Sequence, residues 1–418
     1  MFNFDSIREV KMRFFARFCV QLLLSAALFG QVRLTLADAV AQAVAGNSRL
    51  AVASARIGAA EGLRKQAGLS PNPRLILQLE NTRFWGNPPF SYPQDTATYA
   101  FVAQTVETGG KRSRRVELAM ENIRSSEFEM QLQRNQIVSR VSLAYWAAAG
   151  EAQVRDLLQE EVVNFDRVVQ FHRDRVREGA APEVDLLRIE VERDRLVSLA
   201  RTAAQEAERT RIALFREMGK LEFPSVVLAE PLVQLRPVEL LAPDMVLERR
   251  VEMILAREAI QQARANFRLQ QSNAKPDPDL HLGYERIAGF DTLYAAAQIP
   301  LPVRNRNQGQ IEAAAAEMRA AESSVAATES AIRSELESAL REYESRQKLL
   351  NDTLRPMRDR ANEVYQIVDA AYRETGSDLL RLLDAERTKI DAEVMYARAL
   401  SEFQQSVVAL QTAQGNLP

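Results

Sequence analysis

The sequence predicts a mainly α-helical, elongated chain with a small membrane β part, built by internal tandem duplication. Apolar residues recur every seven positions over 116–144, and the same pattern returns over 311–339, 195 positions later. Each region follows two short segments in which apolar and polar residues alternate, as in strands. Each then continues as a helical pattern of about 65 residues, a rod on the order of 100 Å long. A compact domain could not contain such a rod.

The composition excludes several function classes. The 418 residues include 54 Lys and Arg against 56 Asp and Glu, a balance that argues against a general nucleic-acid binder. No run of about 18 apolar residues marks a membrane-spanning helix. The histidines, His172 and His281, lie too far apart in sequence to form a local metal site. We therefore expect no enzyme activity, no cofactor and no nucleic-acid partner.

Residues 1–30 have the pattern of a secretory signal peptide. Lys11, Arg13 and Arg17 precede an apolar stretch of about 12 residues, and small residues follow it. That stretch is too short to span a bilayer. We expect the mature chain to begin between Ala27 and Arg33. It would then contain no cysteine, because Cys19 is the only one. A buried N-terminal helix is the alternative.

The first structural repeat is expected over 31–220. It opens with an Ala-rich helix over 35–68, which Pro71 and Pro73 end because proline removes a backbone donor. A β-hairpin follows over 73–108, then a long helix over 112–178 and a return helix over 183–218. The long helix continues as a seam of apolar residues spaced by three and four, in which His172 takes one position.

The second structural repeat is expected over 221–418, in the same order. It comprises a helix over 239–273, a β-hairpin over 279–302, a long helix over 309–374 and a return helix over 378–414. Helices of this length must bury their apolar seams against neighbours.

The four strands predict a membrane sheet that one chain cannot complete. Side chains alternate along a strand, so each strand has two faces. We expect Leu77, Phe101, Leu282 and Leu293 to face lipid, and Gln78, Gln104, His281 and Gln298 to face a lumen. Open sheet edges in lipid would leave backbone groups unpaired. A homotrimer would supply twelve strands, enough for a transmembrane barrel with the helices around a common axis.

The junction after the second strand is basic. Gly109-Gly110-Lys111 lacks the glycine spacing of a phosphate-binding loop. The run Lys-Arg-Ser-Arg-Arg at 111–115 could be a nucleic-acid patch. Because it follows a membrane strand, we expect it to contact lipid headgroups or a neighbouring chain.

Three segments resemble a known family. They are Leu-Thr-Leu-Ala-Asp-Ala-Val at 34–40, followed by Asn47; Gln-Thr-Val-Glu-Thr-Gly-Gly-Lys-Arg at 104–112; and Pro-Leu-Pro-Val-Arg-Asn-Arg-Asn-Gln-Gly at 300–309. These segments are similar to those of the TolC family of outer membrane efflux proteins. The second and third most resemble the CzcC-like branch, which serves heavy-metal resistance-nodulation-division pumps.

The resemblance implies a fold, a function and a place in the cell. The fold would be a trimeric α-helical barrel continuous with a 12-stranded β-barrel, four strands per chain. The protein would lie in the outer membrane of a Gram-negative bacterium, with its helices in the periplasm and the strands among outer membrane lipid. It would be a passive exit duct for substrate, heavy-metal cations above all, delivered by an inner-membrane pump through a periplasmic adaptor. A secreted or periplasmic coiled-coil structural or adaptor protein is the alternative.

The resemblance also implies that the helix tips contact the adaptor and narrow the channel with acidic residues. The candidate adaptor contacts are Gly179, Ala180, Ala181, Pro182, Thr375, Gly376 and Ser377. The gate candidates are Asp185 and Asp384, although Arg381 stands where the family pattern often has an acidic residue. The alternative role of both aspartates is to stabilise the first turns of the return helices.

Overall fold

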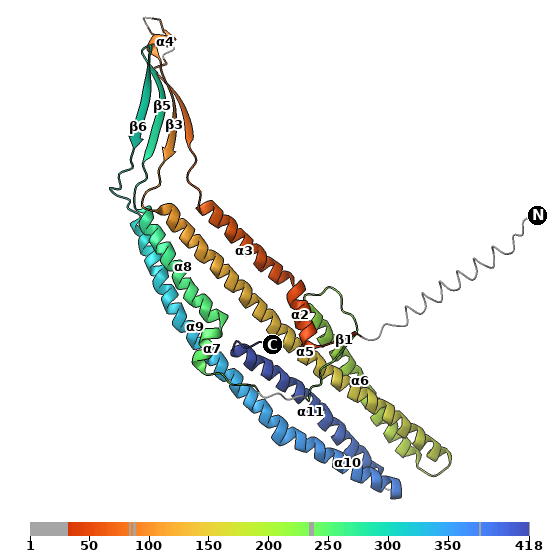
Figure 1. The fold of residues 1–418 in the computed structure, drawn as a ribbon. Coiled ribbons are helices and arrows are strands. Elements are labelled where there is room, and N and C mark those ends of the chain that lie inside the picture. Colours follow the sequence, from red (N-terminus) through yellow and green to blue (C-terminus); the bar gives the residue numbers. More distant parts are fainter. Residues whose placement is uncertain (1–31, 83–84, 87–88, 234–237, 376–377, 418) are drawn as a thin grey trace, which may run out of the picture.

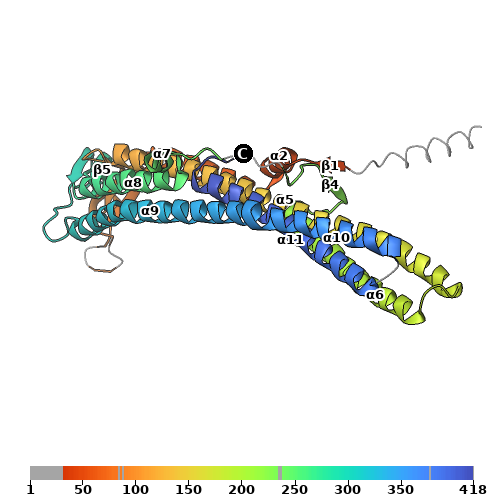
Figure 2. The same ribbon diagram turned by 90° about the horizontal axis from the view of Figure 1, so that it is seen from below.

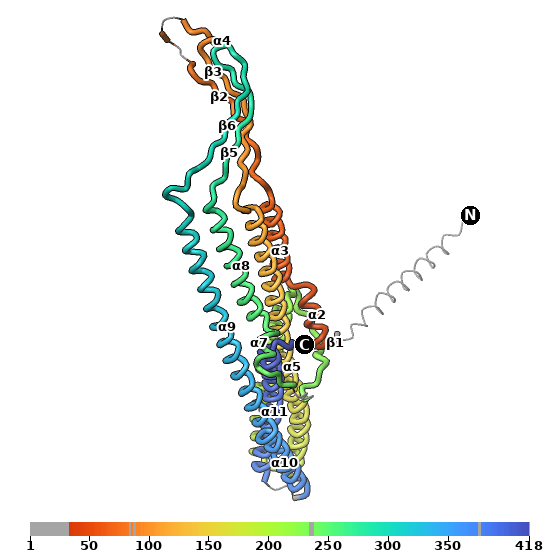
Figure 3. The backbone as a smooth tube through the Cα atoms, turned by 60° about the vertical axis from the view of Figure 1, so that its left-hand side comes forward, coloured from red at the N-terminus to blue at the C-terminus, as the bar shows by residue number. Residues whose placement is uncertain are grey.

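The computed structural model describes residues 32–82, 85–86, 89–233, 238–375 and 378–417. The chain is long and curved, with a sheet at one end and helices running from it to the opposite end (Figure 1). Two further views show the helices following a common long axis (Figures 2 and 3). The expected mainly helical, elongated fold with a small β part is confirmed. The expected signal peptide and Cys19 lie outside the described residues.

The first half contains a helix pair, a hairpin and two long helices. Its elements are β1 Val32–Leu34, α2 Leu36–Gly46, α3 Ser48–Ala67, β2 Arg74–Glu80, α4 Tyr92–Asp95, β3 Ala97–Thr105, α5 Lys111–Arg177 and α6 Glu183–Glu217. The single helix expected over 35–68 is two helices, because the backbone is extended at Asn47. The Asn47 side chain accepts a hydrogen bond from the Arg49 amide at 3.0 Å and so caps α3.

The second half follows the same order with additional breaks. Its elements are β4 Val226–Leu228, α7 Pro243–Arg249, α8 Val251–Asn273, β5 Asp279–Ile287, β6 Phe290–Gln298, α9 Gln308–Lys348, η1 Leu349–Leu354, α10 Arg355–Thr375 and α11 Leu379–Ala413. The helix expected over 239–273 is interrupted at Arg250, where the backbone is extended.

The π-helical turn η1 interrupts the long helix of the second half and explains a shift in the repeat. Upstream of it, Ala339 matches Ala144 at an offset of 195 positions; downstream, Arg373 matches Arg177 at an offset of 196. The second half therefore carries one extra residue between these points. A π turn takes up one extra residue without ending a helix, so η1 is where the insertion is absorbed.

The four-stranded sheet has the order β2-β3-β5-β6, with every neighbouring pair antiparallel. Residues directly opposite each other in such pairs share a face. The register places Leu77, Leu282 and Leu293 on one face, and all three are exposed. Gln78, His281 and Gln298 lie on the other. Strands β2 and β6 are the edges of the sheet in the described part of the chain.

The expected faces of Phe101 and Gln104 are wrong. Phe101 lies opposite Gly283, on the face of His281, and its ring centroid is 5.3 Å from that of His281. Gly283 has no side chain, which leaves room for the Phe101 ring. Gln104 lies opposite Leu280, on the leucine face. The error arose because both faces of β3 carry apolar side chains, so alternation within β3 does not say which one meets lipid.

Cysteine labelling of the expected membrane trimer tests this register. In a chain otherwise free of thiols, cysteines at Leu77, Leu282 and Gln104 are expected to resist a polar thiol reagent, because their face meets lipid. Cysteines at Phe101 and His281 are expected to react from the lumen. Labelling is measured on intact trimers, and the reverse pattern at 101 and 104 would restore the register expected from sequence.

The main core lies midway along the helices, where α2, α5, α6 and α11 meet. Tyr145, Leu214 and Leu400 are completely buried there. The Tyr145 hydroxyl donates to the Leu34 carbonyl at 3.0 Å and accepts from the Glu230 amide at 3.3 Å. It thereby fastens the parallel β1–β4 pair, which the sequence did not predict, to α5.

A second core fills the coiled pairs beyond it. Val154, Leu158 and Phe165 of the predicted α5 seam are buried, and they belong to one cluster with Ile189 of α6 and Ile390 of α11. The seam is therefore confirmed.

The basic run at 111–115 pairs within the chain rather than outward. Lys111 is buried and its ammonium lies 2.6 Å from the Asp277 carboxylate. Arg115 pairs with Glu107. The Lys111–Asp277 pair holds the start of α5 against the segment between α8 and β5, and the Arg115–Glu107 pair holds it to the segment between β3 and α5. The contact of this run with headgroups or a neighbouring chain stays a prediction.

Candidate functional site

The tip of the first helix pair is a short turn between α5 and α6. Gly179 follows α5 with a φ of +73°, which glycine adopts without the strain of a side chain. The Ala180 amide then donates to the Arg175 carbonyl at 2.8 Å, and this closes the end of α5. Pro182 precedes α6, whose first turn contains Glu183 and Asp185. The expected tip residues 179–182 thus form one exposed turn.

The tip of the second helix pair, between α10 and α11, has Asp378 in a left-handed backbone conformation where the first tip has Gly179. Thr375 ends α10, while Gly376 and Ser377 lie outside the described residues. Asp378 has a φ of +69° and caps α11 by accepting from the Arg381 amide at 3.3 Å. The Arg381 guanidinium lies 2.8 Å from the same carboxylate. Arg381, which departs from the family pattern, is therefore paired locally; the sequence signal for this cap is an aspartate directly before the helical pattern.

The two gate candidates occupy different positions around a groove between α6 and α11. The groove has a volume of about 430 Å³ and is lined by Val184, Leu187, Arg188, Val191, Glu192, Leu380, Leu383, Asp384 and Arg387. Asp384 is therefore part of its wall. Asp185 lies on the first turn of α6, with Arg188 3.9 Å away. The beginnings of α6 and α11, distant in sequence, meet at one surface that carries both apolar and charged side chains.

Behind Asp185, a histidine connects the two helix pairs. His172 of α5 is buried, and its Nε2 lies 3.2 Å from the Tyr372 hydroxyl of α10. Within the described residues its Nδ1 has no hydrogen-bond partner. Burial lowers the pKa of His172, and the positive charge of Arg175 lowers it further, against an opposing effect of Asp185. The neutral imidazole is therefore favoured in this contact, which the sequence predicted only as packing.

Farther from the tip, a buried layer of charge joins α5, α10 and α11. The Lys389 ammonium lies 2.7 Å from the Glu161 carboxylate and 4.8 Å from the centroid of the Tyr365 ring. Glu386 is buried beside this pair. Burial and the negative charge of Glu161 raise the pKa of Glu386 to about 7. Sequence patterns did not single out these residues, because a glutamate on a coiled coil is usually solvated.

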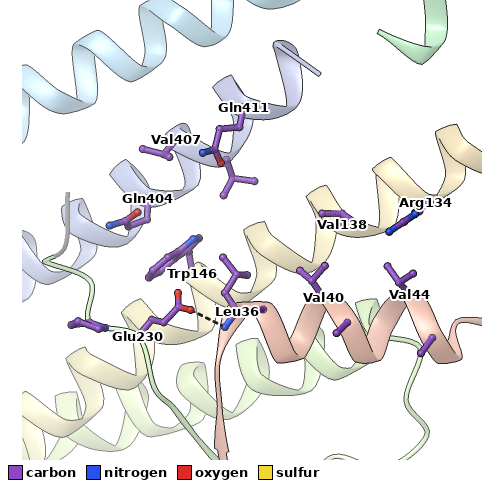
Figure 4. Close-up of a pocket in the computed structure, with 15 residues that line it drawn as sticks. Leu36, Val40, Val44, Arg134, Val138, Trp146, Glu230, Gln404, Val407 and Gln411 are labelled. Carbon is purple, nitrogen blue, oxygen red and sulfur yellow. Dashed lines mark hydrogen bonds between the residues drawn. The ribbon is translucent and has the colours of Figure 1, made fainter. Parts of the chain in front are cut away.

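A larger cavity of about 730 Å³ lies between α2 and α11, above α5, far from the tips (Figure 4). Val40, Val44, Val138 and Trp146 make most of its wall apolar. The Glu230 carboxylate at its edge accepts from the Leu36 amide at 3.2 Å.

Two properties of the described residues bear on membrane and metal contacts. No helix there is both long and apolar enough to cross a membrane. No three His, Cys, Asp or Glu side chains there come together in a way that could hold a metal ion.

The fold defines a class of protein: an elongated helical chain whose four-stranded sheet has a leucine-rich face and open edges. Comparison with known proteins gives the family. Residues 39–215 match the model of a family described as outer membrane efflux protein. The cobalt-zinc-cadmium resistance protein CzcC of Cupriavidus metallidurans is 23% identical over 390 residues, which cover 91% of this chain and 90% of CzcC.

Solved structures agree on the fold. The open state of the MtrE outer membrane channel of Neisseria gonorrhoeae matches with a TM-score of 0.75 at 19% identity, covering 91% of this chain and 89% of that one. The outer-membrane channel OprN matches with a TM-score of 0.74 at 21% identity, covering 91% and 90%.

The chain matches the outer membrane efflux protein family over residues 39–215. It is an outer membrane channel whose helical part lies in the periplasm, and not an enzyme. Members of the family form trimers and work with adaptors and inner-membrane pumps. The alternative of a secreted coiled-coil structural or adaptor protein is thereby set aside.

Proposed function

We propose that this channel is the exit duct for heavy-metal cations delivered by a resistance-nodulation-division pump. The observation that carries the proposal is the similarity to a cobalt-zinc-cadmium resistance protein along about nine-tenths of both chains. Metal would pass through as cargo.

Metal tolerance of cells tests the cargo. Removing this chain is expected to increase the cellular content of Zn²⁺, Co²⁺ or Cd²⁺ and to lower growth in their presence, because export loses its outer membrane step. Metal content is measured by mass spectrometry, with the intact chain restored as control. Unchanged metal content together with new sensitivity to organic compounds would contradict the metal cargo.

The adaptor contact is proposed at the tips, including residues 179–182 and the groove between α6 and α11. Leu187, Val191 and Leu380 are exposed in or beside that groove, and Arg188 and Arg387 flank them. Apolar side chains with charged neighbours suit the apolar face of a helix from a partner. An adaptor with a helical tip is the partner that this surface would accept.

Asp185 and Asp384 are proposed as the gate. In a trimer each carboxylate would be repeated three times around the axis, so like charges would approach one another and attract cations. The local partner of Asp185 is distant at 3.9 Å, which leaves most of its charge available. Asp384 has no ion pair within the described chain.

Conductance measures the gate directly. Multivalent cations are expected to block single trimers in planar bilayers, and Asp185→Asn with Asp384→Asn is expected to weaken that block several-fold. The block should also weaken as salt rises, because the screening length is about 8 Å at physiological ionic strength. Glu160→Gln with Glu363→Gln removes the same charge from exposed positions outside the groove and serves as control. Equal block in the gate variant and the wild type would remove both aspartates from the gate and leave Asp185 as a residue of the first turn of α6.

A further inference from the structure

An apolar stripe continues beyond the end of the sheet. Leu293 lies on the leucine face of β6, and the alternation continues through Ile299, Leu301 and Val303 after the strand ends. Leu301 is 78% exposed and Val303 71% exposed, as much as the leucines on that face. The stripe therefore extends the surface that meets lipid toward the periplasm.

The sequence explains how this extension tolerates leaving the sheet. Pro300 and Pro302 alternate with the stripe residues. Proline has no backbone N–H, so at these two positions no donor is left unpaired when the ladder ends. The Val303 amide donates to the Leu301 carbonyl at 2.8 Å, so its donor is satisfied by a tight turn at Pro302. The exposed apolar side chains of this segment can thus lie against the inner edge of the bilayer.

Directly after the stripe, the chain forms a structured turn. The Asn305 side chain accepts from the Asn307 amide at 3.0 Å, and the Gln308 side chain accepts from the Arg306 amide at 2.8 Å. Asn307 donates from its side chain to the Gln270 carbonyl of α8 at 2.8 Å, which fixes the turn to the helices. The amide side chains of Asn305 and Gln308 bond within the turn, while Arg304 and Arg306 remain exposed.

The two arginines differ from Lys111 and Arg74, which lie at the same level. Lys111 and Arg74 lie within 3.0 Å of Asp277 and Asp279. In the described part of the chain neither Arg304 nor Arg306 has a carboxylate partner; the Arg306 Nε donates only to the Pro302 carbonyl at 3.1 Å. Two guanidinium groups therefore stand unneutralised where the apolar surface ends.

We propose that the 304–307 turn binds the phosphate of an anionic phospholipid in the periplasmic leaflet, while the stripe contacts its acyl chains. A guanidinium group matches phosphate with two parallel hydrogen bonds. Arginine at the end of an apolar membrane surface also places its charge at headgroup depth. The adjoining stripe favours a lipid over free phosphate, because only the lipid satisfies both surfaces. The proposal rests on the outer membrane location and is independent of cargo and gate.

Lipid retention by purified trimers tests the proposal. Trimers in detergent are mixed with equal amounts of phosphatidylglycerol and phosphatidylcholine, and bound lipid is counted by native mass spectrometry. Wild type is expected to retain phosphatidylglycerol preferentially. Arg304→Gln with Arg306→Gln is expected to reduce that preference by roughly thirtyfold, since each arginine near an anionic surface contributes about fivefold. Arg56→Gln with Arg201→Gln, which removes two exposed charges away from the junction, should leave it unchanged.

Three further measurements show whether lipid retention depends on the apolar stripe, on the charge of the arginines, or on simple anion binding. Glycerol phosphate in excess should not displace the lipid if the stripe contributes, and Leu301→Ser with Val303→Ser should weaken retention of both lipids. If the glutamine variant fails to form trimers, Arg304→Lys with Arg306→Lys keeps the charge and is expected to retain a reduced preference. Equal retention of the two lipids by wild type, or full preference in the glutamine variant, would overturn the proposal. If glycerol phosphate displaces phosphatidylglycerol, the 304–307 turn is a simple anion site and the lipid assignment is overturned.

Discussion

Replacing Arg250 with methionine is expected to destabilise the helical part by about 2–3 kcal/mol. Arg250 is 5% exposed, and its guanidinium lies 2.9 Å from Glu252 and 2.8 Å from Glu335. It also donates to the Ala413 carbonyl at 2.9 Å, so one side chain joins the start of α8, α9 and the end of α11. Breaking a buried ion pair costs about 3–5 kcal/mol. We expect the lower value because the side chain of Glu335 is 48% exposed and water would partly solvate it.

The matched control is Arg333→Met on α9. Its guanidinium lies 2.9 Å from Glu329 and 3.4 Å from Asp244, but the side chain is 47% exposed. Exposed ion pairs contribute at most about 1 kcal/mol, so this change should have little effect. The variants Arg250→Met and Arg333→Met are compared by the temperature at which each loses its helical circular dichroism signal in detergent. Equal shifts for Arg250 and Arg333 would mean that burial does not set the strength of these pairs.

The order of elements could be predicted because long periodic segments leave few alternatives. Heptads that repeat at a fixed offset predicted both long helices, and α5 spans Lys111–Arg177 where 112–178 was expected. The breaks at Asn47 and Arg250 were harder to predict, because neither residue is proline or glycine and the helical pattern continues past both.

The remaining differences between the expected and the observed structure depend on contacts between segments that are distant in sequence. β1 and β4 are three residues each, and pairing across 194 positions has no local signal. Strand β3 is apolar on both faces, so only its neighbours β2 and β5 fix which face holds Phe101. At the tip, sequence reasoning found the helix starts that carry Asp185 and Asp384. It could not find the contact of His172 with Tyr372, because that contact depends on how α5 packs against α10.

Replacing Glu386 with glutamine is expected to stabilise the helix tips at pH 8. Glu386 is 6% exposed, and burial followed by the charge of Glu161 raises its pKa to about 7. Asp369 and Glu192 add further negative charge, and only Lys389 opposes it. At pH 8 the carboxylate must therefore be charged in a place that disfavours charge. Glutamine has the same shape without the charge, and the stabilisation should be about 2–3 kcal/mol.

The direction of the pH dependence follows from proton binding. Between about pH 4.5 and pH 7 the folded protein holds a proton on Glu386 that the unfolded chain has released, so this contribution to stability is complete below about 4.5 and is lost as pH rises through 7. The advantage of Glu386→Gln should accordingly be small at pH 5 and largest at pH 8. His172 has the opposite dependence, since its lowered pKa makes the folded state lose stability as pH falls below about 6.5. The contribution of His172 is the same in the wild type and in Glu386→Gln, so it cancels in the difference between their stabilities.

The measurement is a set of thermal transitions recorded at pH 5, 6, 7 and 8. The control Glu160→Gln, at an exposed position, should show no change with pH in its stability relative to wild type. A constant difference between Glu386→Gln and wild type over that range would show that Glu386 keeps its charge in the folded tip, compensated by Lys389.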